Sequence, residues 1–244
     1  MTTLLTSTPV SSSPPDSRPL IAPVSLPFYG RSLSEYAASF SLDLATLRRR
    51  AILDVGSGPS SLAVDAARRD LDVAAVDPLF GCTHETLATH VQLDYARVAV
   101  DACKRLRGER LAQREALEAE RRAAAQRFLA DYESGFLHNR YVGGALPRLP
   151  FLDRSFDLVL CGHVLFGQYA PFDANGLFEA CCELVRVSAN EARVAPVEQI
   201  EPDAVQNLQV RLESVGITTR FAPTLSLGGK PLPAGLMILQ RAPK

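Results

Sequence analysis

The stretch that decides the fold is Ala51-Ile-Leu-Asp-Val-Gly-Ser-Gly-Pro-Ser-Ser61. Ala51 to Val55 is a short apolar run that ends at a glycine, which predicts a buried parallel strand. Gly56 and Gly58 carry no Cβ, so the backbone can turn sharply there and come close to a ligand. The stretch therefore predicts a strand followed by a glycine turn.

A helix and a second strand are expected after the turn. Ser60 or Ser61 can cap a helix that runs to about Asp70. A second apolar strand, residues 73–76, ends in Asp77, about twenty residues beyond the turn. Strand, glycine turn, helix, strand and terminal acid form the nucleotide-binding half of a doubly wound α/β fold. The carboxylate is then placed to accept hydrogen bonds from both ribose hydroxyls of an adenosine.

The composition of the turn favours one class of adenosine cofactor. A dinucleotide fingerprint has a third glycine or an alanine where this chain has Ser61. Pro59 stiffens the turn and removes a backbone N–H that a pyrophosphate could use. A cofactor without phosphates loses little by this change. The turn therefore suits such a cofactor better than it suits NAD(P).

This block resembles the first motif of class I S-adenosylmethionine (SAM) methyltransferases, an acidic residue followed by a Gly-x-Gly-x-small turn. The match includes Asp54, just before the first glycine, and Asp77 at the end of the next strand. The resemblance implies S-adenosyl-L-methionine as cofactor, with Gly56 and Gly58 under its methionine and ribose part and Asp77 on the ribose. It also implies cofactor contacts from other residues of the same block: Ser57, Pro59, Ser60 and Pro78.

The composition favours a single α/β core. The chain has 244 residues, 47% of them hydrophobic, and a formal net charge of −1. No whole-chain property therefore indicates a nucleic-acid or membrane partner. Five cysteines without C-x-x-C spacing indicate reduced thiols in a cytoplasm rather than disulfides or a zinc site, and we expect no metal. No apolar run is long enough to span a bilayer.

The chain divides into a tail and one domain. Residues 1–25 are rich in Thr, Ser and Pro and lack the features of a signal peptide, so we expect them to be disordered. Residues 26–244 form the expected methyltransferase domain. Within it, residues 83–134 predict a helical insertion that is broken near Gly108. The insertion is mildly basic without interleaved aromatics, which favours a solvated surface over a nucleic-acid face. It could cover the substrate, form a homodimer interface, or both.

The segment before the first strand is a candidate lid. Residues 32–49 have helical spacing and begin with a capping box of Ser32 and Glu35. In the methyltransferase fold this segment often closes over the cofactor. Tyr29, Tyr36 and Phe40 are therefore candidates for a lid or a substrate wall. Core packing against the sheet is the alternative for Tyr36 and is favoured for Phe40.

A second informative block leads into the centre of the sheet. Residues 141–142 predict a third strand, and residues 158–161 predict a fourth that is apolar on both faces. Leu149-Pro-Phe-x-Asp-x-Ser-Phe-Asp157 resembles the loop before the fourth strand of many class I methyltransferases. The family often has an acidic residue after the third strand to bind the adenine amino group, and this chain has none. We expect backbone groups and apolar walls near Ala145 and Leu146 to hold the adenine instead.

The fourth strand ends in Cys161-Gly-His-Val164, at the edge where ligands bind in open α/β sheets. This is not the Asn/Asp-Pro-Pro-aromatic motif of enzymes that methylate planar amino groups in DNA or protein amides, so that substrate class is excluded. His163 could deprotonate a hydroxyl, thiol or amine as the methyl arrives, or only hydrogen-bond substrate or backbone. Cys161 is expected beside the cofactor as a small buried hydrophobe, not as a nucleophile. The substrate-side candidates are Tyr29, Tyr36 and His163.

The rest of the chain completes a seven-stranded sheet. We expect helices at 172–187 and 204–215 and strands at 193–195, 217–221 and 235–240. From about residue 32 onward the chain resembles a group of bacterial class I methyltransferases that share its Gly-Pro-Ser-Ser turn, long helical insertion and Leu-Cys-x-His-x-Leu-Phe strand end. The expected fold is a Rossmann-like, doubly wound sheet, mostly parallel, with an antiparallel C-terminal hairpin.

Together these patterns predict a cytoplasmic SAM-dependent methyltransferase for a small or medium-sized acceptor. Such an enzyme mainly aligns nucleophile and methyl group in a dry pocket. Two alternatives remain open: a domain that binds an adenosyl ligand without turnover, and an NAD(P)-dependent oxidoreductase. The absence of an acid after the third strand keeps the first open. Ser61 and the lack of a Tyr-x-x-x-Lys pair count against the second.

Overall fold

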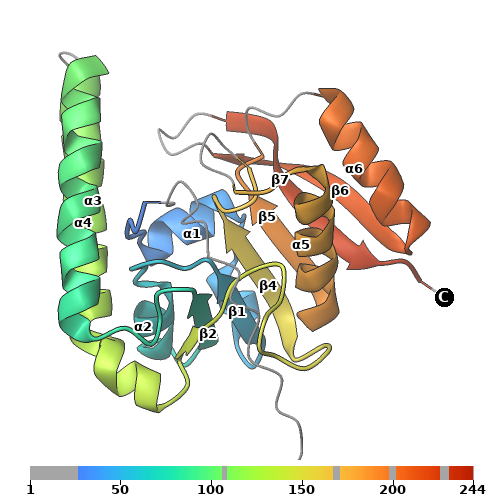
Figure 1. Ribbon diagram of the computed structural model, residues 1–244, viewed down its shortest axis with the longest axis horizontal. Helices are drawn as coiled ribbons and strands as arrows, with labels where there is room; N and C mark the ends of the chain where they lie inside the picture. Colours follow the sequence, from blue (N-terminus) through green and yellow to red (C-terminus); the bar gives the residue numbers. More distant parts are fainter. Residues whose placement is uncertain (1–26, 106–108, 167–170, 198–201, 226–230, 244) are drawn as a thin grey trace, which may run out of the picture.

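The computed structural model, described for residues 27–105, 109–166, 171–197, 202–225 and 231–243, is built around one seven-stranded sheet (Figure 1). The strand order is β3-β2-β1-β4-β5-β7-β6. The first five of these are parallel, and β7 runs antiparallel to both β5 and β6. The strands are β1 (Ala51–Val55), β2 (Asp72–Asp77), β3 (Tyr141–Gly143), β4 (Phe156–Gly162), β5 (Ser188–Ala195), β6 (Ile217–Leu225) and β7 (Pro231–Arg241). This arrangement confirms the expected fold class.

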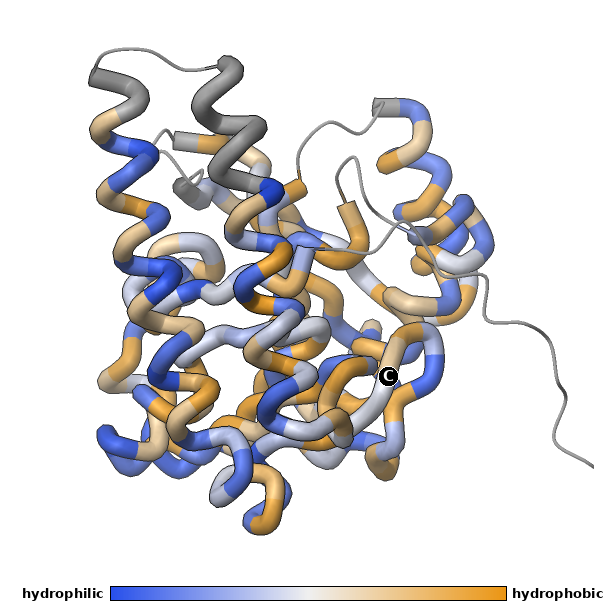
Figure 2. The backbone as a smooth tube through the Cα atoms, turned by 60° about the vertical axis from the view of Figure 1, so that its left-hand side comes forward, coloured by the Kyte–Doolittle hydropathy of each residue, from blue (hydrophilic) through white to orange (hydrophobic). Residues whose placement is uncertain are grey.

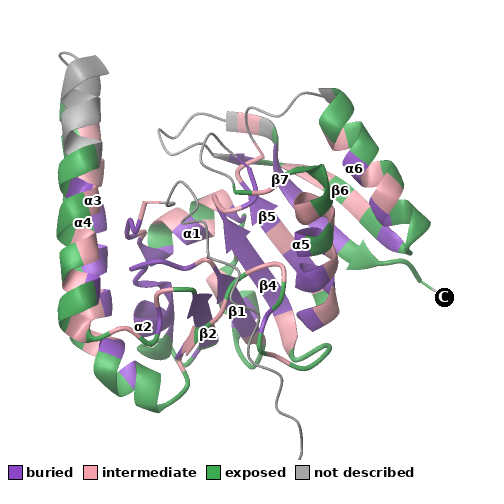
Figure 3. Ribbon diagram, viewed as in Figure 1, coloured by how far each residue is buried: buried purple, intermediate pink, exposed green. Residues whose placement is uncertain are grey.

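Helices cover both faces of the sheet (Figure 1). They are α1 (Leu33–Ser39), a 3-10 helix η1 (Leu44–Leu47), α2 (Leu62–Ala67), α3 (His84–Arg105), α4 (Glu109–Leu137), α5 (Ala174–Val187) and α6 (Pro202–Ser214). Residues of α1, α2 and α4 share one buried apolar cluster with the sheet, and residues of α5 and α6 share another. Figure 3 shows the buried residues along the strands and the exposed ones on the outer faces of the helices.

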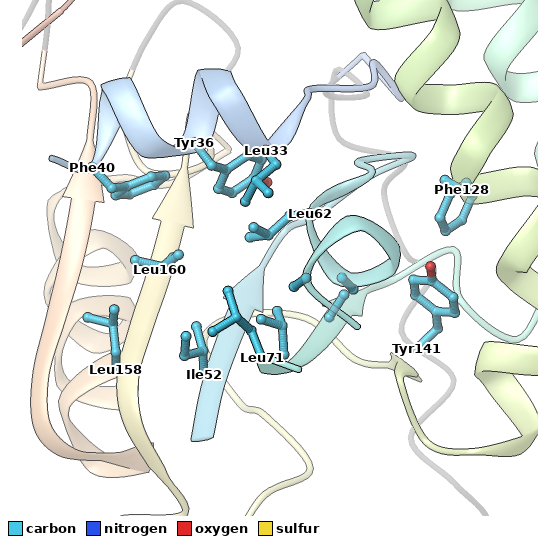
Figure 4. Close-up of a cluster of buried hydrophobic side chains, with 14 of the residues drawn as sticks. Leu33, Tyr36, Phe40, Ile52, Leu62, Leu71, Phe128, Tyr141, Leu158 and Leu160 are labelled. Atoms are coloured by element: carbon cyan, nitrogen blue, oxygen red, sulfur yellow. The ribbon is translucent and has the colours of Figure 1, made fainter. Parts of the chain in front are cut away.

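The alternation of side chains along β1 distributes its residues between the two clusters. Ile52 lies in the cluster of α1 and α2, whereas Leu53 and Val55 lie in the cluster of α5 and α6. Successive strand residues point to opposite faces, so Asp54 falls on the α1 side. Figure 4 shows the apolar residues of α1 pointing from that side toward β1 and β4.

The predicted insertion forms two long helices that lie side by side and extend beyond the sheet (Figures 1 and 2). α3 ends at Arg105 and α4 begins at Glu109; Gly108, where we expected the break, lies in the gap between the described ranges. The C-terminal part of α4 packs on the sheet through Phe128 and Tyr132. The insertion therefore adds both a protruding hairpin and part of the core.

Two helices are shorter than the sequence predicts. The helix expected over residues 32–49 ends at Ser39, because Ser41 has a φ of 50° and cannot continue an α-helix. The helix after the glycine turn ends at Ala67 instead of Asp70, whose φ is 57°. The expected disordered tail, residues 1–25, lies outside the described residues. Among the helices of the described ranges, none has the length and apolar character that a membrane span requires.

Candidate functional site

The glycine turn lies where the strand order reverses, between β1 and β4. Gly56 and Gly58 have φ values of 66° and 55°, a conformation that glycine adopts without strain. A Cβ on Gly56 would lie 2.2 Å from Cγ2 of Val164, just after β4. Glycine at this position thus allows the ends of the two central strands to meet.

Most backbone N–H groups from Gly56 to Leu62 are bonded within the protein. Five of them donate as follows: Gly56 and Ser57 to Val76 O (2.8 and 3.3 Å), Gly58 to Asp77 Oδ2 (2.9 Å), Ser61 to Arg31 O (3.0 Å) and Leu62 to Ser60 Oγ (3.0 Å). Pro59 has no N–H to donate. Free N–H groups at such a turn are what binds a phosphate. This turn is therefore not arranged as a phosphate cradle.

Asp77 is held rigidly at the end of β2. Its Oδ2 accepts from Gly58 N, and its Oδ1 accepts from Leu79 N at 3.0 Å. Burial raises the pKa of Asp77 to about 6, although both backbone hydrogen bonds act in the opposite direction. Each carboxylate oxygen can accept a second hydrogen bond, so the side chain keeps acceptor capacity for a ligand.

Asp54 is a second buried carboxyl beside the turn. Its Oδ2 accepts from the Tyr36 hydroxyl at 2.8 Å, whereas its buried Oδ1 has no hydrogen-bond partner among the described residues. Burial raises the pKa of Asp54 to about 6; the side chains of Ser57 and Tyr36 and the Arg31 charge act against this rise. A buried carboxylate oxygen without a donor is costly, so a donor from a ligand would be favourable here.

The aromatic candidates of the N-terminal segment are buried. Tyr36 and Phe40 stack with ring centroids 5.6 Å apart and belong to the core cluster of α1 (Figure 4). Core packing, the reading favoured for Phe40, is what the structure shows. Tyr36 combines core packing with its bond to Asp54. The Tyr29 hydroxyl donates to Glu118 of α4, and its ring lies 4.4 Å from that of Tyr95.

The helical insertion holds this segment in place. Phe28 N donates to Asp94 Oδ2 of α3 at 2.7 Å. The hydroxyls of Ser32 and Ser34 donate to Glu120 Oε1 of α4 at 2.6 and 2.7 Å. The predicted capping box is present, since Ser32 N donates to the Glu35 carboxylate and Glu35 N to the Ser32 hydroxyl. Part of the insertion therefore packs against the N-terminal segment.

His163 directly follows β4. It has a φ of 60°, and its N–H donates to Ala195 O at 2.9 Å. Burial lowers the pKa of His163 well below its usual range, and the nearby charges of Arg31 and Arg121 lower it further. The imidazole is therefore neutral at pH 7.

The structure does not bring every predicted residue to the turn. Cys161 is fully buried in the cluster of α5, on the face opposite Asp54, where burial raises the pKa of its thiol well above the usual range. Pro78 is exposed just after β2. Ala145 is exposed and Leu146 packs against the α5 cluster.

The loop after β3 nevertheless passes close to Asp77. Gly144 N donates to Asp77 O at 3.2 Å. A Cβ on Gly143 would lie 2.5 Å from Phe80 O, and one on Gly144 would lie 2.7 Å from Cδ of Pro150. Two glycines in succession thus let this loop pack tightly where an acidic side chain would not fit.

Arg31 is a site residue that the sequence did not indicate. Its Nε is buried and has no hydrogen-bond partner among the described residues. Burial lowers its pKa, and the charged groups that act on it are Arg121, Glu35 and Asp54, along with the Tyr36 hydroxyl. Arg121 lies on α4, some ninety positions further along the chain. No local sequence pattern around residues 28–32 predicts that Arg31 and Arg121 lie close together.

Two cavities lie away from the glycine turn. One, of about 260 Å³, lies at the opposite edge of the sheet beside Cys182, Arg186 and Arg241. The other, of about 290 Å³, lies between α1, α2 and α4, where Asp65, Arg127 and Glu120 are all paired. Within the described ranges there is no group of three or more His, Cys, Asp or Glu side chains that could hold a metal.

Comparison with known proteins gives distant similarities. No family model matches the chain. The chain is 25% identical over 176 residues to an uncharacterized protein of Methanocaldococcus jannaschii, covering 69% of this chain and 76% of that protein.

Solved structures are similar at lower identity, and two of them serve as examples. One is the magnesium protoporphyrin IX methyltransferase of Synechocystis with bound SAM (13% identity, TM-score 0.44, 82% of this chain and 74% of that one). The other is a putative SAM-dependent methyltransferase of Methanococcus maripaludis (14% identity, TM-score 0.45, 87% and 84%). The residues around the glycine turn must therefore decide the functional assignment.

Proposed function

We propose that this chain is a SAM-dependent methyltransferase that acts on a small or medium-sized acceptor. The observation that carries the proposal is the electrostatic character of the glycine turn, which has few free N–H groups and two carboxyl groups beside it. Five of its N–H groups are already bonded within the protein, and the carboxyl groups of Asp54 and Asp77 lie beside it. Such a site repels phosphates and attracts cations. SAM has an adenosine, no phosphate, and positive charge on its sulfonium and ammonium groups.

The residues of the turn fit the parts of this cofactor. Asp77, fixed by two backbone N–H groups, has acceptor capacity left for the ribose hydroxyls. Asp54 Oδ1, which has no partner among the described residues, suits the ammonium of the methionine part. The tight loop of Gly143 and Gly144 beside Asp77 offers backbone groups for the adenine.

The bound cofactor would supply an activated methyl group. The chain would align the acceptor with that methyl group, exclude water from the site and supply a base. Tyr36 and Phe40 close the α1 side of the site against water. His163 is neutral at pH 7 and can therefore take the proton that the acceptor loses. Most of the rate enhancement in such a site comes from holding the reactants in line.

The first test is calorimetric titration of the full chain with SAM, S-adenosylhomocysteine and NADH. We expect the two sulfur ligands to bind and NADH not to bind. Asp77→Asn should weaken SAM binding about 100-fold, or about 2.7 kcal/mol, because it removes the charged acceptor of the ribose. Asp72→Asn is the matched control, since Asp72 is exposed at the other end of β2. Binding of NADH alone, or unchanged SAM affinity in Asp77→Asn, would contradict the proposal.

A domain that binds the ligand without turnover is the second candidate, because the loop after β3 has no acid for the adenine. His163→Ala separates the two functions. In an enzyme that uses this base, the variant loses methyl transfer about 100-fold and keeps its SAM affinity. In a silent domain, the wild type itself transfers no methyl group to any acceptor.

A further inference from the structure

Three buried tyrosines in the described part of the chain donate a hydrogen bond from the hydroxyl to a carboxylate. They are Tyr29 to Glu118, Tyr36 to Asp54 and Tyr141 to Asp131. Glu118 also pairs with Arg114 at 2.5 Å, and Asp131 pairs with Arg140 at 2.5 Å. Asp54, although fully buried, has no such arginine among the described residues. Tyr36 therefore holds the one carboxylate of the three that no ion pair of these residues balances.

The charge of Arg31 acts on Asp54, but the free atoms of the two side chains do not meet. Asp54 Oδ1 and Arg31 Nε each lack a hydrogen-bond partner among the described residues, so these two atoms do not bond to each other. Asp54 lies two positions before Gly56, at the carboxyl end of β1, where ligands bind in open α/β sheets. A ligand can therefore supply the donor that Oδ1 lacks, and its charge complements the carboxylate if it is a cation.

The hydroxyl of Tyr36 is fixed by the helix that carries it. α1 begins with a capping box, and Arg121 of α4 binds the carboxylate of its Glu35 by three hydrogen bonds. The Tyr36 ring stacks on Phe40 within the apolar cluster between α1 and the sheet (Figure 4). A carboxylate that accepts at one oxygen from a fixed donor does not rotate freely, so Asp54 Oδ1 keeps one direction.

We propose that Tyr36 is a positioning residue: it holds the Asp54 carboxylate so that Oδ1 accepts from an ammonium, and the site thereby prefers nucleosides that carry an amino group. This inference rests on the proposed function. A hydrogen bond between an ammonium and a carboxylate is stronger than one between neutral groups. A nucleoside without the amino group gains nothing from Asp54, so its affinity should not depend on Tyr36.

The test compares three ligands by calorimetric titration of the full chain. S-adenosylhomocysteine has an amino group and a carboxylate, its decarboxylated form has the amino group alone, and 5′-methylthioadenosine has neither. We expect the first two to bind at least about tenfold more tightly than the third. Tyr36→Phe should weaken the binding of these two about tenfold and change that of 5′-methylthioadenosine by less than about threefold.

Two other results with Tyr36→Phe would overturn the proposal. An equal loss for all three ligands, or no loss for any, is what a merely structural hydrogen bond would give. A loss confined to S-adenosylhomocysteine would mean that Tyr36 acts on the carboxylate of the ligand and not on its ammonium.

Tyr141→Phe is the matched control. Its hydroxyl also donates to an aspartate, at 2.9 Å, but it lies at the first residue of β3, the end of the strand opposite the ligand edge. The affinities for all three ligands should stay within about threefold of the wild type. Thermal melts show whether both variants are folded. A loss of the same size and selectivity in Tyr141→Phe would contradict the specific role of Tyr36.

A double-mutant cycle with Asp54→Asn tests whether Tyr36 acts through Asp54. Asp54→Asn alone should weaken S-adenosylhomocysteine about 100-fold, because the amide carries no charge. Adding Tyr36→Phe should then weaken it by less than about threefold, since the carboxylate that Tyr36 positions is already gone. A further tenfold loss would show that Tyr36 acts independently of Asp54, against the proposal.

The wild type itself separates this inference from the proposed function. If it binds none of the three ligands, the proposed function fails and this inference fails with it. If it binds all three with equal affinity, the adenosine site stands, Asp54 does not select an ammonium, and only this inference fails.

Discussion

The two ion pairs that α4 makes with α1 and α2 differ from the charged groups at the carboxyl edge of β1 and β2 in how completely they are hydrogen-bonded. On α4, Arg121 binds Glu35 and Arg127 binds Asp65. At the strand edge, Asp54 Oδ1 and Arg31 Nε have no partner within the described residues. Complete pairing is what a structural contact needs, whereas buried charges with capacity left over are typical of binding sites. Arg114 Nε of α4 is unpartnered as well, so an unpaired atom marks a binding site only where, as at Asp54, it lies beside the glycine turn.

The largest effect on stability should come from breaking the ion pair between Arg121 and Glu35. Arg121 is 2% exposed, makes three hydrogen bonds to Glu35 and lies 5.1 Å above the Tyr29 ring. Arg121→Met leaves the Glu35 carboxylate without its partner, so the free energy of unfolding should fall by about 3–5 kcal/mol in urea denaturation.

An exposed ion pair serves as the control for this substitution. Arg68 approaches Asp65 at 3.8 Å with 63% of its side chain exposed. Arg68→Met should change the free energy of unfolding by less than about 1 kcal/mol. If Arg121→Met were equally mild, the distinction between the two regions would be lost.

A pH series sharpens the comparison at the strand edge. The pKa of Asp77 is about 6 in the folded chain, against an ordinary 3.8. Between these values the folded carboxyl binds a proton that the unfolded one does not. Its contribution to the stability of the ligand-free protein therefore grows as the pH falls from 6 toward 4, by at most about 3 kcal/mol.

SAM binding should change in the opposite direction, because it requires the ionised carboxyl. Its affinity should fall by up to about tenfold per pH unit below pH 6. Subtracting the Asp77→Asn stability curve from that of the wild type removes the contribution of other groups, including His163, whose lowered pKa favours folding at higher pH. If the stability difference and the SAM affinity changed in the same direction as the pH falls, Asp77 would not be a cofactor-binding residue.

The fold could be predicted from the sequence because its signals are local. The apolar run before Gly56, the glycine turn and the acid at Asp77 lie within one strand-helix-strand unit, so their spacing fixes their relation. The lengths of α1 and α2 could not be predicted as well, since left-handed residues at Ser41 and Asp70 end them without glycine or proline.

The site could be predicted only where it depends on that unit. Asp54 and Asp77 occupy the expected strand ends, but Cys161 points to the opposite face, because strand residues alternate and its neighbour Leu160 faces the α1 cluster. Arg31 was missed because its surroundings come from α4, and contact between these segments is set by tertiary packing of the insertion. The sequence predicts that there is an insertion, but it does not predict which residues the insertion contacts.

The smallest effect, and the one that tests the comparison most directly, is the stability of Arg31→Met. Methionine has a similar length and no charge, so it removes a half-buried guanidinium whose buried Nε has no partner among the described residues. Because Arg31 makes no ion pair among the described residues, we expect the free energy of unfolding to stay the same or rise, by about 1 kcal/mol at most. Arg121→Met, the same substitution at a fully paired arginine, is the matched reference. A loss of several kcal/mol in Arg31→Met would mean that Arg31 makes a structural contact comparable to that of Arg121.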